Sequence, residues 1–289
     1  MHSSRCMRPF LYRVHAIQHG IPKMMDSRLV FFSRSLGSLK LVKSFVPSIQ
    51  NEASKNLLYS STMKKPSLLR SRQKSDSAPK IPKDILLYTN KNGVATLTMN
   101  QPKKLNGWTG PMMLALKDAL LRAANDDSTK VAILTGADPY YCAGVNLSDT
   151  IKPMHPAKLH QMIFESNSAI FNCFIDFQKP LIIAANGPAI GACFTSATLA
   201  DCIIASEKAT FSTPFARLGV PPEGCSSVHF ERIMGKQNAD RMLGTEGWVP
   251  TAAEAKKAGF VKEVVAHEKL VEKAQEVAEQ VDLYPNFPF

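Results

Sequence analysis

Several patterns that mark common protein classes are missing from this sequence of 289 residues. It has no run of 18 apolar residues, so no transmembrane helix is expected. None of its six cysteines forms a Cys-x-x-Cys pair, which argues against a zinc site or a redox dithiol. There is no Gly-x-Gly-x-x-Gly motif, no P-loop and no Gly-x-Ser-x-Gly motif, and His267-Glu268 lacks the second histidine of a His-Glu-x-x-His zinc site. Neither a metal nor a redox cofactor is therefore expected.

Acidic residues are scarce in one part of the chain only. The first 80 residues hold three acids and 15 of the 35 lysines and arginines, a net charge of +12. The remaining residues hold 21 acids and 20 basic side chains, a net charge of −1. The basic character of the chain therefore belongs to its N-terminal segment, and nucleic-acid binding by the folded part is not expected.

The N-terminal segment has the composition of a targeting sequence. Arginines alternate there with phenylalanine and leucine in residues 1–50, which is typical of a mitochondrial transit peptide; a disordered basic tail is the alternative. Residues 51–83 are predicted to be a flexible linker, and residues 84–289 a folded domain. We therefore expect the protein in the mitochondrial matrix, with the peroxisome as the alternative.

Short apolar runs and amphipathic segments alternate over residues 84–289, which predicts an α/β fold. The predicted strands are residues 85–88, 94–99, 131–135, 181–185 and 202–205. The predicted helices are residues 111–124, 160–177, 191–199, a short one between 251 and 259, and 270–281. A helix between apolar strands indicates a β-α-β crossover.

Local signals support these elements. Residues 90–93, Asn-Lys-Asn-Gly, predict a hairpin turn between the first two strands. Thr109 is a candidate N-cap, and Thr251 with Glu254 predicts a capping box.

The segment 181–194 is the most informative stretch. Five apolar residues are followed by Asn186-Gly187-Pro188, which ends the strand, and the chain restarts as a helix after Gly191. The first N–H groups of a helix have no acceptor inside it, so a helix start that opens into a cleft can stabilise an oxyanion. The alternative is an ordinary strand–turn–helix unit without a catalytic role.

Five motifs in a fixed order resemble the crotonase family, the enoyl-CoA hydratases and isomerases. They are Asn-Gln-Pro at Asn100, Cys-Ala-Gly-Val-Asn-Leu at Cys142, Asn-Gly-Pro-Ala-Ile-Gly at Asn186, and the segments 211–227 and 251–261. The resemblance covers about residues 84–281. It implies a spiral of repeated β-β-α turns, here with a short C-terminal helical part, and a homotrimer if the C-terminus is complete enough.

The resemblance also implies a ligand and its binding residues. The ligand is an acyl-CoA thioester, with no separate cofactor, and the backbone N–H groups of Val145 and Ala192 would form the oxyanion hole. The implied substrate-binding residues are Lys103, Lys104, Ala143, Gly144, Val145, Asn146, Leu147 and Gly191.

The acid–base residues distinguish the reactions within the family. The two positions that carry glutamates in family hydratases are Thr195 and Phe215 here, whereas Pro222-Glu223-Gly224 resembles the loop of the Δ3,Δ2-enoyl-CoA isomerases. The implied function is isomerisation of 3-cis- or 3-trans-enoyl-CoA to 2-trans-enoyl-CoA in β-oxidation of unsaturated fatty acids, with Glu223 as the single catalytic acid–base group. The alternatives are a non-catalytic acyl-CoA-binding scaffold, a hydratase and a thioester hydrolase. His229 is interpreted as structural.

Overall fold

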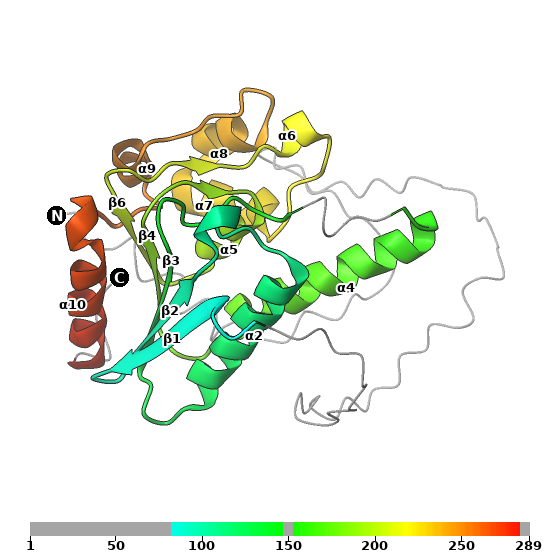
Figure 1. Ribbon diagram of the computed structural model, residues 1–289. Coiled ribbons are helices and arrows are strands. Elements are labelled where there is room, and N and C mark those ends of the chain that lie inside the picture. The colour runs from blue at the N-terminus through cyan, green and yellow to red at the C-terminus, as the bar shows by residue number, and fades with distance from the viewer. Residues whose placement is uncertain (1–81, 147–152, 284–289) are drawn as a thin grey trace, which may run out of the picture. The chain divides into compact units, whose positions relative to one another are not determined.

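A computed structural model describes residues 82–146 and 153–283 (Figure 1). The predicted leader lies outside the described residues, as does the predicted linker except for its last two positions. Leu147, one of the expected substrate-binding residues, also lies outside them.

The described part of the chain begins with a tight β-hairpin. Strands β1 (Leu86–Lys91) and β2 (Val94–Met99) pair in antiparallel register, with Lys91 opposite Val94. Asn92 and Gly93 connect them, and both have positive φ angles, of 54° and 80°. This is the backbone geometry of a two-residue hairpin turn, which matches the right-handed twist of the strands. The turn is shorter than the predicted 90–93 because β1 continues to Lys91.

A mainly parallel sheet forms the centre of the domain. Its strand order is β1-β2-β3-β4-β6-β8, and every pair after the hairpin is parallel. The further strands are β3 (Val131–Gly136), β4 (Leu181–Ala185), β6 (Cys202–Ser206) and β8 (Glu263–Val265). Helix α2 (Gly110–Asn125) connects β2 to β3, and α4 (Pro156–Ile175) precedes β4. The predicted α/β architecture is confirmed.

A second, small sheet completes the repeating pattern. Strands β5 (Ala189–Ile190) and β7 (Phe211–Ser212) pair in parallel, and each follows a strand of the large sheet. The chain order β4-β5-α5 and β6-β7-α6 is the predicted succession of β-β-α turns; α5 is Ala192–Ala197 and α6 is Phe215–Leu218. The remaining elements are η2 (Pro102–Lys104), α7 (Ser226–Met234), α8 (Lys236–Leu243), α9 (Ala252–Ala258), η3 (His267–Lys269) and α10 (Leu270–Leu283).

Side-chain caps fix several helix ends. The Thr109 hydroxyl accepts a hydrogen bond from the Met112 N–H at 3.3 Å, as expected of an N-cap. Thr251 and Glu254 form the predicted capping box. Helix α4 starts earlier than the predicted residue 160, because His155 caps it through its ring nitrogen and Pro156 occupies its first position.

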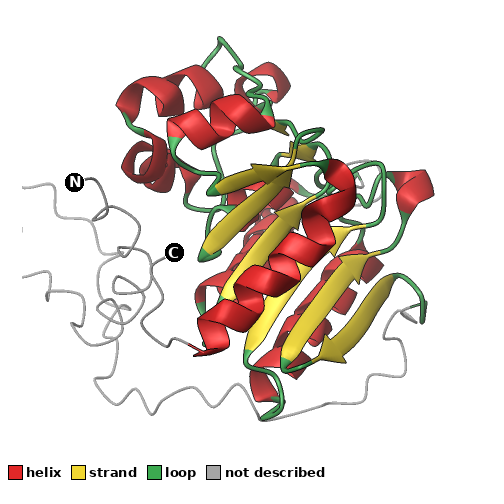
Figure 2. Cartoon of the chain, turned by 90° about the vertical axis from the view of Figure 1, so that its left-hand side faces the viewer, coloured by secondary structure: helices red, strands yellow, loops and turns green. Residues whose placement is uncertain are grey.

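Helices cover both faces of the large sheet, but unevenly (Figures 1 and 2). Helix α10 lies across one face, and the opposite face packs on α2 and α4 in the larger core. The side chains between α10 and the sheet form a separate apolar cluster. In it the strand residues that face α10 pack against Leu270, Ala274, Ala278 and Val281. The sheet is therefore packed between helices on both faces, and this packed frame positions the loops at the strand ends.

Candidate active site

Two turns that come from different repeats lie side by side. Cys142 forms a parallel β-bridge with Ala189. The Cys142 N–H donates to the Pro188 carbonyl at 3.1 Å, and the Cys142 carbonyl accepts from the Ile190 N–H at 3.0 Å. These bonds fix the register between the segments 142–145 and 189–192, the two segments in which oxyanion donors are expected.

The first turn presents the N–H of Val145. The Trp108 N–H donates to the Gly144 carbonyl at 2.8 Å, and the Trp108 carbonyl accepts from the Asn146 N–H at 3.0 Å. The carbonyl before Val145 and the N–H after it are therefore both used for pairing. The Val145 N–H points away from that ladder. Gly144 has a φ of 92°, and a Cβ there would lie 2.9 Å from the Ile190 carbonyl oxygen. Glycine therefore lets the first turn approach the second closely.

The second turn presents the N–H of Ala192, the first residue of α5. Gly191 precedes it and donates its own N–H to the Ser212 carbonyl at 2.8 Å, while a Cβ on Gly191 would meet no atom within 4 Å. Open space thus lies beside the start of α5. Among residues 82–146 and 153–283, the N–H groups of Val145 and Ala192 donate to no backbone carbonyl of a turn or loop.

Glu223 lies in the loop between α6 and α7 and is half-buried. The Asn167 side-chain amide of α4 donates to Glu223 Oε2 at 2.8 Å. The Glu223 carbonyl accepts from both the N–H and the hydroxyl of Ser226, at 3.1 and 2.6 Å, which fixes the loop at the start of α7. Burial raises the pKa of the Glu223 carboxyl, and the hydrogen bond from Asn167 partly opposes this.

The Glu223 loop packs directly against α5. A Cβ on Gly224 would lie 2.6 Å from Thr195 Oγ1 and 2.5 Å from the ring of Phe171. Thr195 is one turn after Ala192 on α5, and its hydroxyl donates to the Ala192 carbonyl at 3.0 Å. The structure therefore brings Glu223, Asn167 and the start of α5 into one region, although they are far apart in sequence.

The two other positions considered for acid–base chemistry are closed to solvent. Thr195 is 0% exposed and Phe215 is 4% exposed. Both lie within the packed interior, and neither carries a titratable group.

The basic residues Lys103 and Lys104 are exposed on η2. The segment that follows them joins the first turn, because the Ala143 N–H donates to the Leu105 carbonyl at 3.0 Å. The lysines thus lie on a loop that is hydrogen-bonded to the Val145 turn, and their role in ligand binding stays a prediction.

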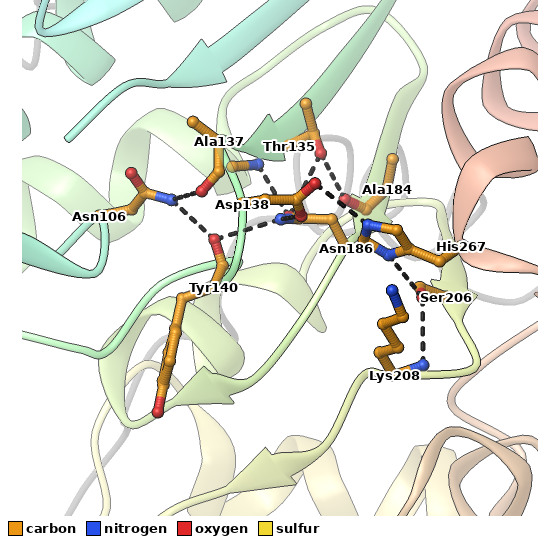
Figure 3. Close-up of polar contacts among 11 residues, drawn as sticks. Asn106, Thr135, Ala137, Asp138, Tyr140, Ala184, Asn186, Ser206, Lys208 and His267 are labelled. Atoms are coloured by element: carbon orange, nitrogen blue, oxygen red, sulfur yellow. Dashed lines mark hydrogen bonds and ion pairs between the residues drawn. The ribbon is translucent and has the colours of Figure 1, made fainter. Parts of the chain in front are cut away.

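The two histidines considered above have structural partners. The Nε2 atom of His229 lies 2.7 Å from the Thr198 carbonyl oxygen, which ties α7 to the end of α5. His267 lies between Asp138 and Ser206, with Nε2 3.1 Å from Asp138 Oδ2 and Nδ1 3.0 Å from the Ser206 hydroxyl (Figure 3). Within the described parts of the chain, no cluster of His, Cys, Asp or Glu is arranged to hold a metal ion.

Asn167 is the residue of this region that sequence reasoning missed. It lies on α4 one turn before Phe171 and on the side of Ile170, both of which are buried. A polar amide on an apolar helix face is the signal that could have identified it.

Comparison with known proteins agrees with this architecture. Residues 89–285 match the family model described as enoyl-CoA hydratase/isomerase. The chain is 38% identical over 193 residues to enoyl-CoA delta isomerase 3, peroxisomal, of Mus musculus, covering 66% of this chain and 59% of that protein. It is 39% identical over 186 residues to enoyl-CoA delta isomerase 2 of Homo sapiens, covering 63% and 46%. The chain therefore spans about half the length of these curated relatives.

A solved structure shows the same fold. The enoyl-CoA hydratase/isomerase from Pseudoalteromonas atlantica superposes with a TM-score of 0.62 at 31% identity, covering 68% of this chain and 76% of that one.

Proposed function

Because this chain belongs to the enoyl-CoA hydratase/isomerase family, we propose that it moves the double bond of a 3-cis- or 3-trans-enoyl-CoA to the 2-trans position. The single observation that carries the proposal is the half-buried Glu223 carboxylate, packed through Gly224 against α5. The names of the relatives, enoyl-CoA delta isomerases, support the same reaction class. The proposed pathway is β-oxidation of unsaturated fatty acids.

The reaction needs one proton acceptor and a stabilised oxyanion. Glu223 takes a proton from C2, the electron pair of the broken C–H bond enters the conjugated system, and negative charge develops on the thioester oxygen. The N–H groups of Val145 and Ala192 donate to that oxygen, each contributing roughly 3 kcal/mol if like a measured oxyanion-hole donor. The protonated Glu223 then returns the proton to C4, and the double bond ends between C2 and C3. One carboxylate is sufficient because it both takes and returns the proton.

The environment of Glu223 suits this role. Burial raises the pKa of the carboxyl, which makes it a stronger base than an exposed glutamate. The hydrogen bond from Asn167 holds one carboxylate oxygen in place and favours the ionised form, which partly opposes the effect of burial on the pKa. The site therefore supplies a carboxylate that is held in position and is more basic than an exposed glutamate.

The packing around Thr195 argues against hydration. Addition of water needs a second group to position and activate it, and the corresponding positions of family hydratases are the buried Thr195 and Phe215 here. Gly224 packs directly against Thr195, and a Cβ on Gly224 would also meet the Phe171 ring. The absence of a second carboxylate and of room for one favours isomerisation over hydration.

The proposal extends to the ligand, the assembly and the location. We propose that Lys103 and Lys104 pair with CoA phosphates and that the protein forms a homotrimer in the mitochondrial matrix, with the peroxisome as the alternative location. The described helices include none that meets the length and apolarity needed for a membrane span. Light scattering coupled to size exclusion tests the trimer, and import of a reporter fused to residues 1–50 tests the location.

The decisive experiment assays the purified full chain with 3-cis- and 3-trans-enoyl-CoA. We expect turnover to the 2-trans product, and a fall of about two to four orders of magnitude in Glu223→Gln, with acyl-CoA affinity retained. Glu231→Gln, an exposed carboxylate on α7, is the matched control and should keep wild-type rates.

Each alternative function has its own outcome in this assay. Tight binding of the acyl-CoA without turnover would indicate a scaffold. Water addition to a 2-enoyl-CoA would indicate a hydratase, and release of free CoA thiol a thioester hydrolase. A loss smaller than about tenfold in folded Glu223→Gln would assign the chemistry to another group.

A further inference from the structure

A polar network with two buried asparagines joins segments that lead into the two turns of the site (Figure 3). Its centre is the carbonyl oxygen of Tyr140, which accepts from two asparagine side chains. Asn106 Nδ2 donates to it at 2.7 Å and Asn186 Nδ2 at 3.3 Å. The two asparagines are 0% and 6% exposed. Buried amides with this many partners hold backbone segments in one arrangement, because losing a partner in a dry site is costly.

Asn106 connects the η2 loop to the segment after β3. Its Oδ1 accepts from the Gln101 N–H at 2.9 Å, and its Nδ2 also donates to the Ala137 carbonyl at 2.6 Å. The Asn106 carbonyl in turn accepts from the Cys142 thiol at 3.0 Å. Asn106 therefore joins the η2 loop at Gln101, the segment 137–140 after β3, and Cys142 at the start of the first turn.

Asn186 makes the corresponding connections from the second turn. Its Oδ1 accepts from the Gly136 N–H at 3.1 Å, and its Nδ2 donates to Asp138 Oδ1 at 2.9 Å as well as to Tyr140. Asn186 directly follows β4, and the chain continues through Gly187 into β5 and then to Ala192. It therefore holds the second turn to the segment that becomes the first.

The packing around this network leaves little freedom. A Cβ on Gly187 would overlap the Pro139 carbonyl, and one on Gly136 would overlap the carbonyls of Tyr140 and Tyr141. The segments touch through bare backbone, so one cannot shift without moving the other. The Tyr140 carbonyl is thus the acceptor that both turns share, through Asn106 for the first turn and Asn186 for the second.

We propose that Asn106 and Asn186 are positioning residues that set the alignment of the Val145 and Ala192 N–H groups through the shared Tyr140 carbonyl. The proposal rests on the proposed oxyanion hole. Two donors must aim at one oxygen, so a small displacement of either turn weakens binding of the charged, enolate-like state more than binding of the neutral ester. The two residues should be partly redundant, because one amide still donates to the Tyr140 carbonyl when the other is removed.

The test compares two CoA esters of equal chain length on the full-length protein. Acetoacetyl-CoA, whose 1,3-dicarbonyl group ionises to an enolate with its own ultraviolet absorption, reports on the oxyanion hole, and butyryl-CoA reports on ground-state binding. In Asn106→Ala and Asn186→Ala we expect turnover and enolate affinity to fall together by about tenfold or more, with butyryl-CoA affinity changed less than about threefold. The double variant should lose more than the product of the two single losses.

The controls separate positioning from folding. Asn238→Ala removes another side-chain bond to a backbone carbonyl, on α8 and outside the network, and should match wild type. If the alanine variants do not fold, Asp138→Ala decides by the same criterion, because it removes an acceptor of Asn186 at a side chain that is 59% exposed. Folded variants that keep enolate affinity, or that lose affinity for both esters equally, overturn the proposal. A wild-type protein that neither isomerises nor prefers the enolate overturns the proposed function, and this proposal with it.

Discussion

Replacing Asn167 with leucine isolates the contact between α4 and Glu223, the proposed acid–base carboxylate. Leucine has the same branching and number of side-chain heavy atoms as asparagine and favours the helix, but it cannot donate to Glu223 Oε2, which Asn167 reaches at 2.8 Å. A hydrogen bond to a charged group contributes about 1.5–3 kcal/mol, and solvent screening at the half-buried Glu223 reduces this to about 1 kcal/mol. Because the bond lowers the pKa of Glu223, its loss raises that pKa.

The sign of the effect on rate follows from the role of the base. If Glu223 is the base, as proposed, only its ionised form takes a proton, so kcat/KM should rise with pH through its pKa. In Asn167→Leu this rise should move to higher pH. About 1 kcal/mol corresponds to a roughly fivefold larger loss at acidic pH than at alkaline pH, where the carboxylate is ionised in both proteins. Asn172→Leu, an exposed asparagine of the same helix, is the matched control.

The assay is the rate of 3-trans-enoyl-CoA isomerisation from about pH 5 to pH 9, measured for both variants and wild type. The reasoning is refuted if the Asn167→Leu profile falls by one factor at every pH, since that result indicates a structural role only. An unchanged profile would refute the contact itself.

Three further outcomes follow from the same region. Glu223→Gln should raise the free energy of unfolding relative to wild type at alkaline pH, because a carboxyl whose pKa is raised by folding destabilises the native state where it must ionise. The difference should shrink as pH falls from the raised pKa of the folded protein to the ordinary glutamate pKa, below which both states are protonated; urea titrations at several pH values measure this. Ala192→Pro should remain folded, since proline is tolerated at the first helical position, yet lose about a hundredfold or more in turnover with the N–H, and steady-state kinetics with a thermal melt would expose a folded variant of normal rate. Thr195→Glu should lower the melting temperature without adding hydratase activity, because Gly224 and Phe171 occupy the space that its carboxylate needs; appearance of water addition to a 2-enoyl-CoA would contradict this.

Much of the fold could be predicted from sequence because its signals are local. The Asn92-Gly93 turn, the Thr109 cap and the Thr251–Glu254 capping box are each defined within a few residues, and the structure confirms all three. Apolar runs likewise mark the buried strands of the parallel sheet. The strands β5 and β7 were missed because each has only two residues, too few to show a period.

The candidate site was less accessible because its contacts are not local. Asn167 and Glu223 are 56 positions apart, and no pattern in either segment indicates the other. The amides of Asn106 and Asn186 meet at Tyr140 although these residues are 34 and 46 positions from it in sequence. The sequence could indicate Glu223 and the two turns through resemblance, whereas the residues that hold them depend on three-dimensional packing.

Helix α10 covers one face of the sheet through a cluster separate from the larger core, and two of its buried contacts, Ala274 and Ala278, are small. Small side chains bury little apolar area, so we expect α10 to open locally at a lower free energy than the strands beneath it, and its amide hydrogens to exchange as one group. Such an opening would uncover Val131, Ile133 and Ile182 together. The native protein would then transiently expose an apolar face of the sheet. Its rate of association with other copies would depend on how often α10 is open, and not on how often the whole chain is unfolded.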